Sequence, residues 1–413
     1  MCSLQQHNNA APGENEKMKE KAKKQTSTRM SAFFLQNAAA VLLTSVQKCD
    51  LIYTERFCIV KTVGARKKQC QIAKWHFATM LCFGRQEEIF MNRKNVGIAF
   101  GALCGLAALT ATAAEIFYDI SINTKSPIHM SKLNNLVQKA TNTAGNEEEA
   151  SAKYSGMTGT PEIKEWYATH GEDVYILSDS LRLHGKRFKN TGTKYVLVCH
   201  GYTSKAKHMA GFVHKFYTLG YNVLAVDARA HGDSEGTKIG MGWPERMDII
   251  KWINRILSWE PNARIVLHGV SMGAATVLMA SGEDLPENVK AVIADCGYTS
   301  EWDEFQREAD TLHIPWFPVL NATSVLSKIR DGYDFKQASA LAQVKKSRIP
   351  TLFIHGSSDE LVPYSMLGEL YAAAACEKEE LTVEGAGHAL SSSVAPTLYW
   401  RTVEDFIAKY LDR

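Results

Sequence analysis

From about residue 161 to residue 413, short apolar runs alternate with stretches in which apolar residues recur at helical spacing. The strand-like runs are DVYILS (173–178), YVLVCHG (195–201), NVLAVDA (222–228), RIVLHG (264–269), VKAVIAD (289–295), TLFIHG (351–356) and ELTVEG (380–385). Strands that are apolar nearly throughout are buried on both faces, as they are when helices cover both sides of a parallel sheet. We therefore predict an α/β fold with one domain at 161–413.

One interval interrupts this alternation, because residues 300–348 form a long insertion between two strand-like runs. An insertion of this length in a compact domain is usually functional. Its aromatic residues Trp302, Trp316 and Phe317 either line a pocket or pack the insertion onto the domain, and packing is the simpler expectation.

The stretch Gly269-Val270-Ser271-Met272-Gly273 fits the G-x-S-x-G pattern between a strand-like and a helix-like run. The pattern suits a nucleophile on a sharp strand-to-helix turn, and small residues at Gly269 and Gly273 let strand and helix approach closely. Alone it is weak evidence, because serine and glycine are common. A serine nucleophile also needs a base, a carboxylate that orients the base, and donors for the developing oxyanion.

The polar residues that follow the apolar runs are the candidates, because ligands bind at the carboxyl ends of parallel strands. Ser271, Asp359 and His388 follow three different predicted strands, in the chain order that this turn motif expects. We predict Ser271 as the nucleophile, His388 as the general base and Asp359 as the orienting carboxylate. Asp295, which also ends a strand, is the alternative acid.

The predicted oxyanion donors are two backbone N–H groups. Met272 begins the helix after the nucleophile, where the helix dipole favours negative charge, and Tyr202 lies in the turn after the run 195–201. Two other side chains of the loop DARAHGDSEG, Asp227 and His231, are interpreted as structural. No metal-ligand spacing or nucleotide-binding glycine pattern occurs, so we expect neither a metal nor a cofactor.

Residues 96–114 carry no charged side chain and are about long enough to cross a hydrocarbon core of roughly 30 Å. Arg93 and Lys94 precede this run, so the positive-inside rule places the N-terminus in the cytoplasm. We predict an uncleaved signal-anchor over 95–117 in a single-pass cell-membrane protein whose catalytic domain is extracytoplasmic. The alternatives are a cleaved signal peptide with a secreted domain, or a buried helix of a soluble domain.

The flanking segments differ from the predicted domain. Residues 1–90 have a net charge of +7 and five of the nine cysteines, and we expect a poorly ordered extension, with translation starting at Met91. Residues 91–413 carry a net charge of −4, which argues against nucleic-acid binding. The polar residues 118–160 are expected to form a linker. The remaining cysteines are far apart, so we expect no disulfide.

The motifs HGYTS, DARAHGDSEG, GVSMGAA, HGSSDELVP and GAGH, in this order, resemble those of the α/β-hydrolase superfamily. The resemblance is closest to bacterial membrane-anchored hydrolases of the serine aminopeptidase and monoacylglycerol lipase-like branch, and it covers about residues 155–413. It implies an eight-stranded, mostly parallel sheet, a helical cap at 300–348, and the triad and oxyanion donors named above. Val270 and Ala274 depart from the G-H-S-M-G-G sequence usual in the related lipases.

We therefore expect a serine hydrolase that cleaves carboxylic esters, short to medium or lipid-like, through an acyl-enzyme on Ser271. A peptidase that acts at a free N-terminus is the alternative. It would need an anionic subsite, for which the insertion offers Glu301, Asp303, Glu304 and Glu308, although a solvated acidic helix face is the simpler expectation for them. A non-catalytic binding protein on the same fold is the third possibility. The expected partners are a small ester substrate and the membrane, and the oligomeric state is left open.

Overall fold

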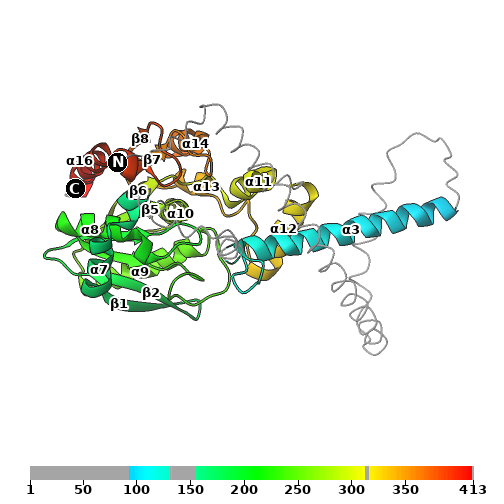
Figure 1. Ribbon diagram of the computed structural model, residues 1–413, viewed down its shortest axis with the longest axis horizontal. Helices are drawn as coiled ribbons and strands as arrows, with labels where there is room; N and C mark the ends of the chain where they lie inside the picture. Colours follow the sequence, from blue (N-terminus) through cyan, green and yellow to red (C-terminus); the bar gives the residue numbers. More distant parts are fainter. Residues whose placement is uncertain (1–92, 131, 133–153, 312–315, 412–413) are drawn as a thin grey trace, which may run out of the picture. The chain divides into compact units, whose positions relative to one another are not determined.

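The computed structural model describes residues 93–130, 132, 154–311 and 316–411 (Figure 1). The predicted extension 1–90 and the proposed start at Met91 lie outside the described residues. The chain divides into two compact units, Met1–Thr112 and Ala113–Arg413.

The second unit contains one eight-stranded sheet with the strand order β1-β2-β4-β3-β5-β6-β7-β8. Strands β1 and β2 pair with each other antiparallel, and β2 also pairs antiparallel with β4, whereas every pair from β4 to β8 is parallel. The strands are β1 (Glu172–Ser178), β2 (Leu181–Phe188), β3 (Lys194–Cys199), β4 (Asn222–Val226), β5 (Arg264–Val270), β6 (Val289–Asp295), β7 (Thr351–Gly356) and β8 (Lys378–Val383). The predicted α/β fold with an eight-stranded, mostly parallel sheet is confirmed.

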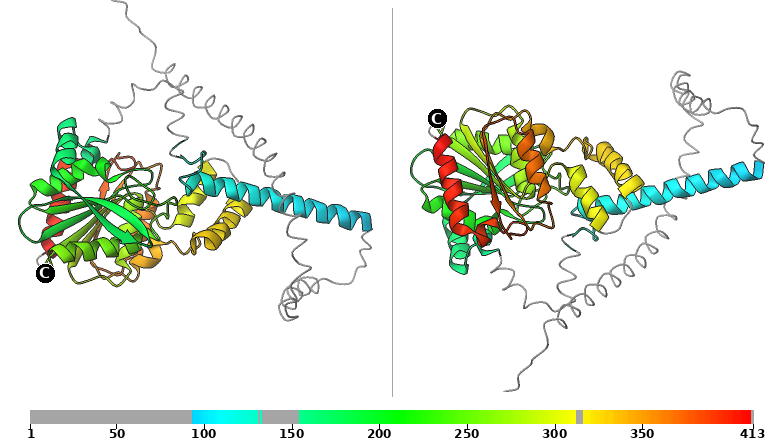
Figure 2. Two further views of the ribbon diagram at one scale, coloured as in Figure 1. Left: turned by 90° about the horizontal axis from the view of Figure 1, so that it is seen from below. Right: turned by 90° about the horizontal axis from the view of Figure 1, so that it is seen from above.

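Helices cover both faces of this sheet, as Figure 2 shows from two sides, with α16 in red on one face. The described helices are α3 (Arg93–Ser121), α6 (Ser155–Thr158), α7 (Pro161–His170), the 3-10 helix η2 (Ala206–Met209), α8 (Ala210–Thr218), α9 (Glu245–Trp259), α10 (Met272–Ser281), α11 (Glu301–Thr311), α12 (Trp316–Asp331), α13 (Ala340–Val344), α14 (Ser365–Ala373), α15 (Ser391–Val394) and α16 (Pro396–Leu411).

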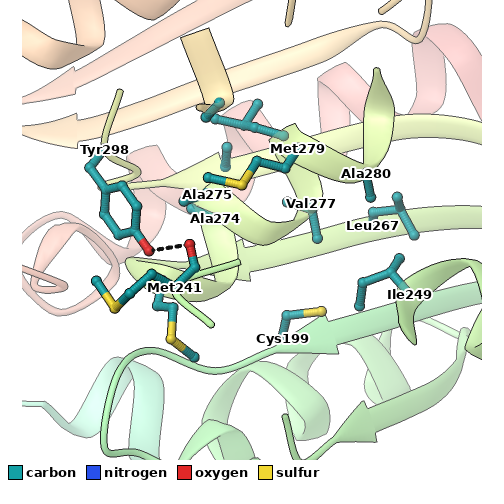
Figure 3. Packing of buried hydrophobic residues seen from close by; sticks show 14 of the residues in the cluster. Cys199, Met241, Ile249, Leu267, Ala274, Ala275, Val277, Met279, Ala280 and Tyr298 are labelled. Carbon is teal, nitrogen blue, oxygen red and sulfur yellow. Dashed lines mark hydrogen bonds between the residues drawn. The ribbon is translucent and has the colours of Figure 1, made fainter. Parts of the chain in front are cut away.

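The apolar strands supply two cores because successive side chains point to opposite faces of a sheet. In β3, Val196 and Val198 pack with α8 and α16, whereas Leu197 packs with α9 and α10 on the other face. Small side chains of α10, among them Ala274 and Ala275, let this helix lie close to the sheet (Figure 3). These two layers fix the central strand β5 and the turn that follows it.

The edges of the predicted domain differ from the structure. Strand β2 has no apolar run in the sequence, yet it pairs with both β1 and β4. The flanks of the predicted linker 118–160 also pack into the second unit: Ile122 is buried, and α6 packs against α8. The physical reason is that these flanks contain apolar side chains that the unit buries, whereas residues 133–153 lie outside the described residues.

Helix α3 contains one apolar segment, Gly101–Ser121, that could cross a membrane by its length and composition, with a mean hydropathy of 1.4. The predicted span 95–117 overlaps this segment. From Ala113 onward the helix belongs to the second unit, and Phe117 and Tyr118 are buried there. A membrane span over the whole helix therefore remains a prediction.

Candidate active site

Ser271 lies in the turn between β5 and α10, near the middle of the sheet. Its backbone has φ 56° and ψ −119°, a region that residues other than glycine rarely adopt. A side chain at Gly269 would clash with the backbone of Gly273, and one at Gly273 would clash with the carbonyl group of Cys199. Both glycines are therefore required by the close crossing of strand and helix, as the sequence pattern predicts.

The structure brings together the three side chains of the predicted triad, which come from the ends of three strands. The His388 imidazole has Nε2 2.9 Å from Ser271 Oγ and Nδ1 2.8 Å from Asp359 Oδ2. Ser271 and His388 are half-buried, whereas the Asp359 side chain is buried. A base that contacts a hydroxyl on one side and a carboxylate on the other is the arrangement that serine nucleophiles require.

The carboxylate of Asp359 is held from several directions. The backbone N–H groups of Leu361 and Val362 donate to Oδ1, each at 2.9 Å, and His355 Nε2 lies 3.3 Å from Oδ2. Burial raises the pKa of this carboxyl, but the hydrogen bonds from His355 and His388 outweigh burial, so the pKa lies well below its usual range. Asp359 is therefore ionised at neutral pH, and its carboxylate can accept the hydrogen bond from Nδ1 that orients His388. His355 was missed in the sequence, where it reads as part of the apolar strand TLFIHG.

The alternative acid, Asp295, makes no side-chain hydrogen bond to His388. Its backbone carbonyl accepts from the N–H of Ser271 at 2.8 Å, and its side chain is buried at the end of β6. Burial raises the pKa of this carboxyl to about 6. The geometry favours Asp359 over Asp295 as the partner of the histidine.

The predicted oxyanion donors flank the serine. Met272 is the first residue of α10, where a helix leaves N–H groups without internal partners. On the other side, a Cβ added to Gly201 would lie 3.3 Å from Ser271 Cβ, so the turn that carries Tyr202 passes directly beside the nucleophile. Among the described residues, neither the N–H of Tyr202 nor that of Met272 has a protein acceptor. Both roles stay predictions.

The loop after β4 holds this turn in place through buried histidines. The N–H of Thr203, next to Tyr202, donates to His231 Nε2 at 3.1 Å, and the N–H of Ala228 donates to His200 Nε2 at 3.0 Å. Burial lowers the pKa of His231 to about 3, so its ring is neutral and Nε2 can accept. The structure thus supports the structural interpretation of His231.

The side chain of Tyr202 joins the turn to the end of α3. Its hydroxyl donates to the carbonyl oxygen of Ser121 at 2.8 Å and lies 3.5 Å from His129 Nε2. The next residue, Ile122, accepts from the N–H of Ile239 at 3.0 Å. The segment after α3 is therefore part of the scaffold of the candidate site.

We expect Tyr202→Phe to lower the free energy of unfolding by about 1 kcal/mol, because it removes one intramolecular hydrogen bond. The backbone N–H of Tyr202 remains in the variant, but its position is less constrained. The kcat should therefore fall by less than the roughly 10²–10³-fold that loss of an oxyanion donor costs. Denaturant unfolding and steady-state kinetics measure the two effects. Tyr175→Phe, at a half-exposed position on β1, is the matched control. An unchanged kcat in Tyr202→Phe would show that the hydroxyl does not position the turn.

Two groups of side chains among the described residues have the spacing to hold a metal ion. One is Cys296 with Asp359 and His388, and the other is His184 with Asp227 and Asp233. In the second group His184 Nδ1 lies 2.7 Å from Asp227 Oδ2, so these two side chains already satisfy each other. The first group shares two side chains with the predicted triad.

The acidic residues of α11 do not form the solvated face expected from the sequence. Glu301 is 0% exposed and Glu304 is 8% exposed. Burial raises the pKa of both carboxyls, well above the usual value for Glu301. Glu304 Oε1 accepts from Arg307 at 2.8 Å, whereas its Oε2 has no hydrogen-bond partner among the described residues.

Comparisons with known proteins identify a family profile, relatives and a solved structure that resemble this chain. The family profile described as "Serine aminopeptidase, S33" matches residues 192–331. YqkD of Bacillus subtilis is 33% identical over 217 residues, which cover 51% of this chain and 70% of that protein. A lysophosphatidylserine lipase, ABHD12 of Macaca fascicularis, is 24% identical over 213 residues, covering 51% of this chain and 50% of its own. Among solved structures, the esterase Pf2001 of Pyrococcus furiosus superposes with a TM-score of 0.50 and 25% identity, covering 61% of this chain and 94% of that one.

Proposed function

The chain belongs to the α/β-hydrolase superfamily, and we propose that it is a serine hydrolase that cleaves carboxylic esters through an acyl-enzyme on Ser271. One observation carries this proposal: the hydrogen-bonded series from Ser271 Oγ through His388 to Asp359, at 2.9 and 2.8 Å. The strained backbone of Ser271 supports it, because a residue held at an unfavourable φ usually serves a function.

The geometry supports the following sequence of steps. His388 Nε2 takes the proton of Ser271 as Oγ attacks the ester carbonyl carbon, and the N–H groups of Tyr202 and Met272 stabilise the oxyanion. His388 then gives this proton to the departing alkoxide, which leaves an acyl-enzyme and a free alcohol. A water molecule that loses its proton to His388 hydrolyses the acyl-enzyme, and the serine regains its proton. The ionised Asp359 stabilises the imidazolium that forms in each half-reaction.

We propose short to medium acyl or lipid-like esters as substrates. An esterase and a lysophosphatidylserine lipase among the similar proteins support an ester. The apolar segment of α3 supports a membrane location, with residues 95–117 as a single-pass anchor and, by the positive-inside rule, an extracytoplasmic catalytic domain.

A peptidase acting at a free amino terminus is the second candidate. The observation that favours it is the buried oxygen Oε2 of Glu304, which has no hydrogen-bond partner among the described residues and could accept from a substrate ammonium group. A panel of acyl esters and aminoacyl amides separates the two candidates, and we expect the esters to be cleaved with the higher kcat/KM.

The nucleophile is tested by labelling the full chain with a fluorophosphonate and mapping the modified peptide by mass spectrometry. We expect the phosphonyl group on Ser271, and no labelling in His388→Ala, because the serine then lacks its base. Folded wild-type protein that resists the probe would favour the alternative of a non-catalytic binding protein.

A further inference from the structure

We call helices α11 and α12, which lie in the insertion 300–348, the cap. Helix α12 exposes large apolar side chains. Phe317 is 67% exposed, Val325 59% and Ile329 76%. Val325 and Ile329 are four residues apart and so lie on the same side of the helix. The buried residues recur at spacings of three and four on the other side, and they are Leu320, Thr323, Ser324 and Ser327. We call Val325 and Ile329 the apolar cap face.

Helix α12 lies beside the last turns of α3 (Figure 1), and side chains of the two helices are hydrogen-bonded to each other. The Arg330 guanidinium donates to both carboxylate oxygens of Glu115, at 2.8 and 2.9 Å. Tyr118 donates to Asp331 at 2.8 Å, and the hydroxyl of Thr323 lies 3.4 Å from the carbonyl oxygen of Ala114.

The second cap helix is attached at the same place. Phe305 of α11 packs edge to face on Phe117, with ring centroids 5.5 Å apart. Both helices of the cap therefore hold the same end of α3, and the cap is fixed to it rather than suspended on a flexible linker.

The attachment of the cap to the end of α3 indicates which surface covers the apolar cap face. Helix α3 is continuous from Arg93 to Ser121, and the attachment points Ala114 and Glu115 lie inside its apolar segment Gly101–Ser121. About 20 residues suffice to cross the bilayer, and the first 20 residues of the proposed anchor 95–117 end at Ala114. Residues 114–118, which bind the cap, directly follow such a span in the chain, so a membrane-embedded span would bring the cap next to the bilayer surface.

We propose that the apolar cap face lies in the surface of the lipid bilayer that α3 crosses, which holds the domain at the surface where amphiphilic esters reside. The inference rests on the proposed membrane anchor. Burial in the acyl boundary gives the exposed Val and Ile side chains an apolar environment, the usual energetic basis of interfacial binding.

Photo-crosslinking tests the position of the face without relying on catalysis. The full chain, reconstituted in phosphatidylcholine nanodiscs, carries p-benzoylphenylalanine in place of Ile329 or, as the control, in place of Leu177 on β1, which is 71% exposed. We expect a lipid adduct by mass at position 329 and none at 177. A crosslinked homodimer at 329, or no lipid adduct there, would overturn the proposal.

Kinetics provide the second test. The double variant Val325→Asp with Ile329→Asp should hydrolyse an ester embedded in vesicles at least about tenfold more slowly, because two apolar side chains no longer bind the bilayer. Its rate on a water-soluble short-chain ester should not change, and Leu177→Asp should alter neither rate. Equal losses on both esters, or no loss, would contradict the proposal. If wild type cleaves no ester but position 329 still crosslinks to lipid, the proposed function fails and the membrane contact stands.

Discussion

Ser271→Ala should lower kcat by roughly 10⁶-fold while the protein stays folded. The hydroxyl is the atom that attacks the ester, and the alanine variant retains only substrate binding and the oxyanion donors. The methyl group of alanine fits wherever the serine side chain fits. Among the described residues, removing the oxygen breaks only the hydrogen bond to His388 at 2.9 Å. Steady-state kinetics with a soluble ester measure the loss, and circular dichroism verifies the fold.

His388→Ala should cost nearly as much as Ser271→Ala, and the double variant should cost little more than either, because the two side chains act as one unit. Ser258→Ala, at an exposed position on α9, is the matched serine control and should retain the wild-type rate. Losses that multiply in the double variant would mean that serine and histidine do not act in one step. A Ser271→Ala variant with wild-type kcat would remove the basis of the proposed mechanism.

The central part of the fold could be predicted because its signals are local. Parallel strands buried on both faces produce continuous apolar runs, and β3 and β5 to β7 all have them. Strand β2 reads LRLHGKRF and pairs antiparallel on both sides, with a partly exposed face. Half of its residues are therefore basic or histidine, and only the pairing partners, which are distant in sequence, make it a strand.

The candidate site shows the same division. The glycines around Ser271 and the order of serine, aspartate and histidine are local signals, so the sequence predicts side chains that the structure brings within hydrogen-bonding distance. The contact between Tyr202 and Ser121 joins residues 81 positions apart and leaves no pattern in either segment. The burial of the α11 carboxyls could not be predicted from the sequence either, because acidic residues at helical spacing usually face water.

Asp359→Asn should lower kcat by about 10⁴-fold without displacing the side chain. The carboxylate accepts from His388 Nδ1–H and so leaves Nε2 free to take the serine proton. An asparagine amide can instead donate to Nδ1, which places the ring proton on Nε2, where the base must be unprotonated. Crystal structures of the variant and pH–rate profiles with a soluble ester measure the geometry and the rate.

Asp295→Asn is the matched control, since it is a buried aspartate at the end of the neighbouring strand β6. Its kcat should stay near the wild-type value, because its side chain makes no hydrogen bond to His388. The difference in free energy of unfolding between this variant and wild type should depend on pH. The folded pKa of Asp295 is about 6 and the unfolded pKa is about 3.9, so wild type loses stability as pH rises from about 4 through 6. Asparagine does not titrate, so the variant should gain stability relative to wild type over this range, measured by urea unfolding at pH 4 and 7. A larger loss of kcat in Asp295→Asn than in Asp359→Asn, at equal stability, would reverse the assignment of the acid.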